Sequence, residues 1–319
     1  MSGRLGAAII VAAFLPVHCL AQEADAGSAA VQSPTQDVTI SFNRPGEGSK
    51  WTPVDLSQGL PLVPVEIAGQ PSCALIDTTA SRTIVDLDLV RIAGLETVSS
   101  DLEFSLNGSA QDRVRRVLDV PVSAPGQFEL RANLAGADLP GIACADGGEV
   151  GLVLGGDLLE WLAFAIHPQR GRIVFAGSGG INPTSDRFVR IEWKDGLVVG
   201  TIDKQPVLLE VATASAAPLY VYEDAFESVF PGSEIEQLGE GGKLGRPSAE
   251  IAIGDITATA PAIRVARTGD GAEEHRADAR IGFGLIEYFV TVFDRGAGRI
   301  LIRVPDLPES ANGPEPSDD

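Results

Sequence analysis

The sequence predicts an all-β protein made of two tandem β-barrel domains with a few short helices. Short runs of Val, Ile, Leu and Phe alternate with polar residues and are separated by Asn-Gly, Pro-Gly and Gly-Gly turns, a pattern typical of strands joined by tight turns. Helical patterns are few, and the clearest ones span residues 85–95 and 155–162. An internal repeat relates the two halves of the chain, which predicts that each half is one copy of the same domain.

The repeat is clearest near the end of each half, where residues 151–175 match residues 277–302. Aligning Gly155 with Gly282 also aligns a Leu, a Glu and an aromatic residue of the following helix. A Gly-Arg-Ile run then matches in both copies. Each copy therefore reads as a glycine turn, a short amphipathic helix, a strand, a tight turn and a second strand.

A second match lies upstream, between residues 65–85 and residues 200–220. Both segments contain a Gln-Pro turn between two apolar strands, followed by a loop that contains threonine. In this alignment Asp77 falls opposite Ala212. The two halves therefore share one order of elements, which predicts two domains related by a pseudo-two-fold axis.

The chain begins with a segment that reads as a signal peptide, residues 1–21. One positive charge precedes an apolar stretch, and small residues allow a cut after Ala21. We therefore expect a secreted or periplasmic protein. No other segment is long and apolar enough to span a bilayer, so we expect no stable membrane insertion after the signal is cleaved.

The rest of the chain divides by composition. A leader rich in Ala, Ser, Gly and Pro is expected to be flexible and to end in an edge strand, and a Pro-rich acidic tail cannot bury enough apolar surface to fold. The segments that we predict are a leader at 22–50, a first domain at 51–176, a linker at 177–186, a second domain at 187–304 and a disordered tail at 305–319.

Charge and cysteine content narrow the function classes. The net charge is −20, from 44 acidic and 24 basic residues, which argues against nucleic-acid binding and against adhesion to anionic membranes. Once the signal is removed, Cys73 and Cys144 are the cysteines that remain. In an oxidising compartment they would form one disulfide, and the alternative is two buried free thiols.

The chemistry centres on "ALIDTTASRTIVD", in which an apolar strand ends at Asp77. This stretch resembles the catalytic loop of aspartic peptidases of the retropepsin and pepsin type, an apolar strand that runs into Asp-Thr-Gly. "LVLGGDLLEW" resembles the partner motif of the same family. The likeness covers most of the mature chain, and it is closest to bacterial exported retropepsin-like proteins. It implies two acid-protease β-barrels with a peptide-binding cleft between them.

The resemblance also implies a mechanism and assigns residues. Two carboxylates, one from each half, share a proton, so that one activates a water molecule while the other acts as acid. Asp77 would be one of them, and Thr78 would brace the loop. Two departures weaken the implied activity: Thr79 stands where the family has Gly, and Ala212 stands where it has the second Asp. A β-branched residue tolerates positive φ poorly and adds bulk beside the carboxylate.

Three functions follow from these departures. The chain is an inactive relative that binds peptides or unfolded protein segments in the cleft or serves another protein. Alternatively it is an active endopeptidase in which Asp77 pairs with Asp77 of a second molecule. In the third, Glu210 supplies the second carboxylate, since it lies two residues before Ala212 on the same face of a strand. Asp77 could also simply cap a turn.

The family's flap, a β-hairpin that closes over bound peptide, has one candidate in each half. In the first half the turn at Asn107 and Gly108 is a strong hairpin signal. In the second half a glycine-rich segment around Gly241 and Gly242 holds the equivalent place. No zinc or nucleotide motif accompanies them, so we predict no metal site and no cofactor.

Overall fold

The computed structural model describes twelve segments of the chain. They are residues 31–32, 38–42, 50–100, 105–106, 109–110, 114–139, 141–183, 187–238, 242–246, 248–261, 263–266 and 277–303. Within them, no helix is both long enough and apolar enough to cross a membrane.

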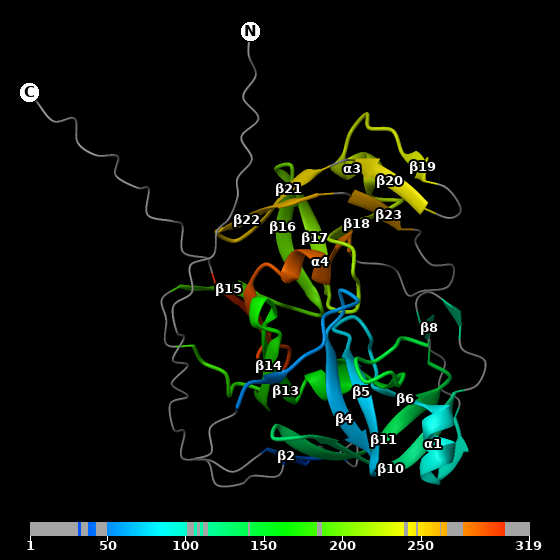
Figure 1. Ribbon diagram of the computed structural model, residues 1–319. Helices are drawn as coiled ribbons and strands as arrows, with labels where there is room; N and C mark the ends of the chain where they lie inside the picture. The colour runs from blue at the N-terminus through cyan, green and yellow to red at the C-terminus, as the bar shows by residue number, and fades with distance from the viewer. Residues whose placement is uncertain are drawn as a thin grey trace, which may run out of the picture.

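The first half of the chain forms a nine-stranded sheet in the order β1-β2-β11-β6-β12-β5-β4-β10-β7 (Figure 1). Pairing of β10 with β11 curls this sheet on itself. Its strands are β1 (Val31–Gln32), β2 (Thr39–Phe42), β4 (Leu62–Ile67), β5 (Gln70–Ile76), β6 (Ile84–Asp86), β7 (Thr97–Ser99), β10 (Arg115–Ala124), β11 (Phe128–Ala137) and β12 (Val150–Leu154).

The second half repeats this arrangement in a second nine-stranded sheet, in the order β19-β20-β23-β18-β24-β17-β16-β21-β22. Its strands are β16 (Leu197–Ile202), β17 (Gln205–Ala212), β18 (Leu219–Tyr222), β19 (Glu236–Leu238), β20 (Gly242–Arg246), β21 (Ala249–Ile253), β22 (Ile256–Ala260), β23 (Ile263–Ala266) and β24 (Ala279–Gly282). In Figure 1 this sheet occupies the upper part of the molecule and the first sheet the lower right.

The repeat seen in the sequence is visible in the strand pairing. In the first half β12 runs parallel to β5 and antiparallel to β6. In the second half β24 runs parallel to β17 and antiparallel to β18 in the same way. The strands β5 and β17 therefore hold equivalent places, and each leads directly into a threonine-containing loop.

A six-stranded sheet joins the two halves, in the order β15-β26-β25-β13-β14-β3. Its strands are β3 (Thr52–Pro53), β13 (Leu162–His167), β14 (Arg172–Gly177), β15 (Phe188–Glu192), β25 (Val290–Asp294) and β26 (Arg299–Arg303). At its centre β13 pairs with β25, and the rings of Phe164 and Phe293 stack with their centroids 4.8 Å apart. The last two strands of each half thus share a sheet, so the domain limits at 51–176 and 187–304 stay a prediction.

The helices of the described chain are short. Two lie within the segments 85–95 and 155–162 that the sequence patterns predict, one follows Gly282 as the repeat predicts, and the helix at Phe226–Val229 was not predicted. They are α1 (Leu87–Ala93), α2 (Gly156–Leu159), α3 (Phe226–Val229) and α4 (Phe283–Ile286), with one 3-10 turn at Pro168–Arg170. Asp86 caps α1 by accepting hydrogen bonds from two backbone N–H groups, and Gly94 ends it in the left-handed conformation. The leader predicted at 22–50 contains β1 and β2. β2 pairs with β1 on one side and with β11 on the other, so it is not the edge strand that the sequence predicted.

A buried ion pair fastens the six-stranded sheet to the connection between the halves. Asp294 is fully buried, and its carboxylate accepts hydrogen bonds from the Arg299 guanidinium at 2.9 Å and from the Ser178 hydroxyl at 2.7 Å. The backbone N–H groups of Gly179 and Ala297 donate to the same carboxylate. Each carboxylate oxygen of Asp294 therefore accepts at least two hydrogen bonds, which is the condition for a buried charge to be tolerated.

We predict that Asp294→Asn lowers the free energy of unfolding by about 3–5 kcal/mol, because it leaves the largely buried Arg299 side chain, which is 13% exposed, without its counter-charge. Urea denaturation followed by fluorescence measures this change. The matched control is Asp88→Asn, which breaks a surface ion pair with Arg91 whose side chains are 74% and 76% exposed. That pair should contribute no more than about 1 kcal/mol. Equal losses in the two variants would contradict the prediction.

Candidate functional site

The Asp77 loop begins where β5 ends, and hydrogen bonds fix its carboxylate. The backbone N–H of Asp77 donates to the carbonyl of Leu154, which ties the loop to β12. One carboxylate oxygen, Oδ1, accepts from the Thr79 N–H at 2.9 Å, the Thr79 hydroxyl at 2.7 Å and the Ala80 N–H at 3.2 Å. The other oxygen, Oδ2, has no hydrogen-bond partner within the described chain. Asp77 is half-buried, so this oxygen is the one that a ligand can contact.

Thr79 supports the carboxylate instead of disturbing it. The strain that we expected from a β-branched residue at positive φ does not arise, since Thr79 is not among the residues with positive φ. Its hydroxyl adds a hydrogen bond that glycine, the residue of the family pattern, has no side chain to make. The substitution therefore holds Asp77 in one orientation.

Two buried threonines lock the loops of the two halves together. Thr78 and Thr213 are 2% and 1% exposed. The Thr78 N–H donates to Thr213 Oγ1 at 3.2 Å, and the Thr213 N–H donates to Thr78 Oγ1 at 3.1 Å. The Thr78 hydroxyl donates to the carbonyl of Val211, and the Thr213 hydroxyl donates to that of Ile76 at 2.6 Å. The exchange is reciprocal, so the residues that precede the two threonines are structural counterparts.

Those counterparts are Asp77 and Ala212. Ala212 ends β17 and is 1% exposed, so a buried methyl group occupies the position that mirrors the Asp77 carboxylate. The alignment of the two halves by sequence gives the same pairing. Thr213, which the sequence analysis did not assign a role, completes the lock.

The two glycines that align in the repeat explain why helices can pack so close to these loops. A Cβ atom on Gly155 would lie 2.1 Å from the Arg82 carbonyl oxygen, and one on Gly282 would lie 2.0 Å from the Ala217 carbonyl oxygen. Neither position admits any side chain. The glycine turns before α2 and α4 are thus required by close contact with the loops that carry Thr78 and Thr213.

Glu210 lies on β17, two residues before Ala212, and is engaged by two neighbours. Its Oε2 accepts from the Arg280 Nε at 2.6 Å and from the Tyr222 hydroxyl at 2.9 Å. Its side chain is 21% exposed, and that of Arg280 is 31% exposed. The carboxylate is therefore held in an ion pair. Its assignment as a substitute second carboxylate stays a prediction.

Arg280 is a second residue of this site to which the sequence assigned no role. The alignment of Gly155 with Gly282 puts Arg280 opposite Val153, so a charged residue stands where the first half has a buried apolar one. Burial lowers the pKa of Arg280, but the Glu210 and Asp77 carboxylates and Tyr222 raise it above its ordinary value. Burial also raises the pKa of the Tyr222 phenol. The site thus holds a permanent positive charge close to Asp77.

The remaining predicted site residues are only partly described. Cys73 and Cys144 form a disulfide that joins β5 to the loop before β12. Asn107, Gly108 and Gly241 lie outside the described residues, while Gly242 begins β20. The strands β8 (Ser105–Leu106) and β9 (Ser109–Ala110) pair as a hairpin on either side of the predicted turn. The flap assignments stay predictions.

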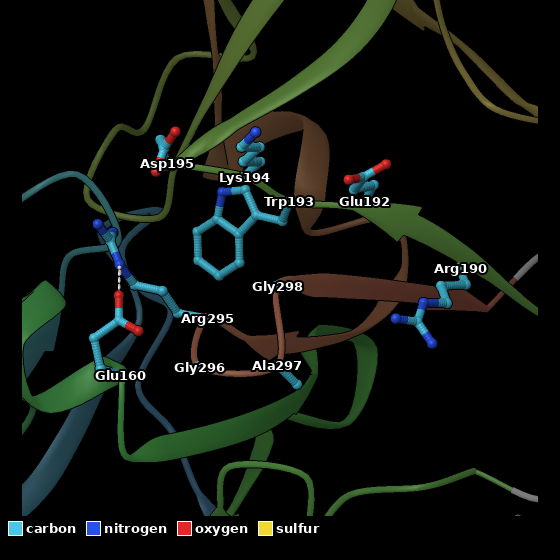
Figure 2. Close-up of a pocket in the computed structure, with 11 residues that line it drawn as sticks. Glu160, Arg190, Glu192, Trp193, Lys194, Asp195, Arg295, Gly296, Ala297 and Gly298 are labelled. Carbon is cyan, nitrogen blue, oxygen red and sulfur yellow. Dashed lines mark hydrogen bonds and ion pairs between the residues drawn. The ribbon is translucent and has the colours of Figure 1, made fainter.

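A polar pocket of about 530 Å³ adjoins the Asp77 loop through Arg295, and its lining does not include Asp77 (Figure 2). Arg295 connects the two, since its Nη1 donates to the Thr78 carbonyl at 3.2 Å while its Nε pairs with Glu160 at 2.7 Å. The guanidinium lies 5.9 Å from the ring of Trp193. The pocket is lined by Glu160, Arg190, Glu192, Trp193, Lys194, Asp195, Gly196, Arg295, Gly296, Ala297 and Gly298. The lining contains both acidic and basic side chains, and Arg295 supports the loop through its hydrogen bond to the Thr78 carbonyl.

Comparison with known proteins identifies the fold. The chain is similar to the crystal structure of an aspartic proteinase from Irpex lacteus, with a TM-score of 0.52 and 11% sequence identity, over 82% of this chain and 99% of that one. No protein-family model matches the chain, and no curated protein matches it in sequence. The structural likeness confirms the predicted fold class of two tandem aspartic-protease-like β domains. At this identity it shows the fold alone.

We predict that Thr213→Val lowers the free energy of unfolding by about 2–5 kcal/mol. The valine keeps the shape of the side chain but leaves the Thr78 N–H and the Ile76 carbonyl buried without partners, and each such group costs about 1–3 kcal/mol. Denaturant titration measures the loss.

Two further variants test whether the lock acts as a unit. Because Thr78 and Thr213 share hydrogen bonds, the double variant Thr78→Val, Thr213→Val should lose less than the sum of the two single losses. Thr259→Val, on the exposed face of β22, is the control and should change stability by less than about 0.5 kcal/mol. Additive losses would show that the two threonines act independently.

Proposed function

We propose that this protein binds extended peptides or unfolded protein segments in a cleft between its two halves, and that it does not cleave them as a monomer. We further propose that it acts outside the cytoplasm, in the periplasm or as a secreted protein, after loss of the signal peptide at residues 1–21. We infer peptide recognition from the likeness of the fold to an aspartic proteinase. We infer the absence of hydrolysis from the residues at the centre of the site.

The observation that carries the proposal is the reciprocal hydrogen bonding of Thr78 and Thr213. This exchange makes Asp77 and Ala212 structural counterparts. The methyl group of Ala212 cannot hold or share a proton. Hydrolysis on this fold needs two carboxylates whose closeness separates their affinities for the proton, so that one is base and the other acid. A lone Asp77 can accept hydrogen bonds from a peptide but has no acid to protonate the leaving amine.

Two active alternatives remain, and each conflicts with a contact in the site. For Glu210 to act with Asp77, its carboxylate would have to leave the half-buried ion pair with Arg280 and the hydroxyl of Tyr222. For Asp77 to pair with Asp77 of a second molecule, the buried hydrogen bonds between Thr78 and Thr213 would have to break. These costs favour a binding protein over an enzyme.

We predict that the full-length protein binds an unfolded substrate such as reduced, alkylated casein and leaves it intact from pH 3 to pH 7. Binding is followed by fluorescence anisotropy of labelled casein, and cleavage by gel electrophoresis with and without pepstatin. Asp77→Asn should show the same absence of cleavage as the wild type.

Pepstatin-sensitive cleavage that disappears in Asp77→Asn would establish a peptidase and overturn the proposal. In that event Glu210→Gln distinguishes the two active alternatives. Loss of activity in this variant would assign the second carboxylate to Glu210, whereas full activity that rises with protein concentration would assign it to a second molecule.

A further inference from the structure

The outer face of the second sheet carries a row of charged and aromatic side chains next to the site. Successive cross-strand pairs place Arg264 beside Tyr220, Tyr220 beside Arg280, and Arg280 beside Glu210. The row ends at Leu197, which pairs with Glu210. Glu210 lies two residues before Ala212 on β17, so the two side chains are on the same face of the strand. The row therefore lies on the face that carries Ala212, the counterpart of Asp77.

The first half has a row built from the same strand pairs, and its character is opposite. Ala135 pairs with Ile84, Ile84 with Val153, Val153 with Leu75, and Leu75 with Leu62. All five side chains are apolar and at most 6% exposed. The disulfide-linked Cys144 and the partly buried Leu139 and Ile142 pack against this apolar cluster. The first row is therefore closed by the chain itself.

The second row is open and offers hydrogen-bond donors. Arg264 is exposed, and Tyr220 and Arg280 are partly exposed. Arg280 uses Nε for Glu210, which leaves the two terminal nitrogens of its guanidinium. Within the described part of the chain, these nitrogens, the Arg264 guanidinium and the Tyr220 hydroxyl have no hydrogen-bond partner. Three neighbouring donor groups without acceptors call for a ligand that is rich in acceptors.

We propose that this row recognises the carboxylate of an aspartate or glutamate side chain in the bound peptide, an inference that rests on the proposed peptide-binding function. Arg264 and Arg280 lie two strands apart, about 10 Å at the backbone, so their long side chains can converge on one carboxylate above Tyr220. The free edge of the Arg280 guanidinium can bind it through two parallel hydrogen bonds while Nε keeps Glu210. The preference of the site is thus set in the second half of the chain.

The net charge of −20 does not prevent this recognition. At physiological ionic strength, charges more than about 8 Å away are largely screened, so contacts within the row decide the affinity. The Glu210 and Asp77 carboxylates both interact with Arg280, so recognition depends on the donors that no acceptor of the described chain engages, the terminal nitrogens of Arg280 and the Arg264 guanidinium. A hydrogen bond from a charged donor contributes enough to change affinity by roughly tenfold or more.

The experiment compares three labelled peptides that differ only in a central Glu, Gln or Lys. Their ends are acetylated and amidated, so that the central side chain carries the only charge that varies. Dissociation constants are measured by fluorescence anisotropy with the full-length protein. The Glu peptide should bind about tenfold or more tightly than the Gln peptide, and the Lys peptide should bind no better than the Gln peptide.

Variants locate the recognition in the row. Arg264→Gln changes an exposed residue and should reduce the preference for Glu over Gln several-fold. Arg280→Gln should abolish the preference, and Arg280→Lys, which keeps the charge but lacks the planar fork, should restore only part of it. Arg190→Gln, an exposed arginine on β15 outside the row, is the matched control and should leave the preference intact.

The outcomes separate the two proposals. If the Glu and Gln peptides bind equally well, the inference about the row is wrong and the proposed function stands. If a preference for Glu persists in both Arg264→Gln and Arg280→Gln, another site recognises the carboxylate and the inference is again wrong. If none of the three peptides and no unfolded protein binds, the proposed function fails and the inference fails with it.

Discussion

The hydrogen bonds between Thr78 and Thr213 are the constraint on which the rest of the site depends. They connect two loops that are 135 residues apart in the chain, and both threonines are almost fully buried. Each loop follows a strand that is hydrogen-bonded into its own sheet. A glycine turn, at Gly155 or Gly282, packs against each loop so closely that no side chain would fit at the glycine. The lock therefore fixes the two halves in register, and it makes position 212 the counterpart of Asp77.

Although their loops are in register, the two halves differ in the side chains that they place at the site. The first half keeps the carboxylate, surrounds it with donors from Thr79 and Ala80, and closes the neighbouring sheet face with apolar side chains and a disulfide. The second half has Ala212 at the equivalent position and an open face with Arg280 and Glu210. A symmetric fold thereby acquires an asymmetric site, in which one side supplies an acceptor and the other supplies donors.

The fold could be predicted because the repeat and the turn residues can be read from short stretches of sequence. The tertiary structure forms the strands and turns that these stretches indicate. The sequence also paired Asp77 with Ala212, since one gapless alignment covers both loops. It could not predict the shared six-stranded sheet, because strand partners in different halves leave no mark in a repeat. The role of Arg280 could not be predicted for a related reason. It depends on a contact with Glu210 on a neighbouring strand, and the sequence does not show which strands are neighbours. Thr79 was misjudged because a family pattern indicates which residue is usual at a position but not which hydrogen bond a replacement can form.

The central claim is that Asp77 acts as a lone carboxylate and not as half of a proton-sharing pair. Carbon-13 NMR of the Asp77 carboxyl, followed over an acid titration in the wild type and in Glu210→Gln, tests it most directly. Two carboxylates that share a proton titrate as a coupled unit in two steps. The account predicts a single step for Asp77 that Glu210→Gln leaves unchanged. Two coupled steps in the wild type that collapse to one in Glu210→Gln would contradict it.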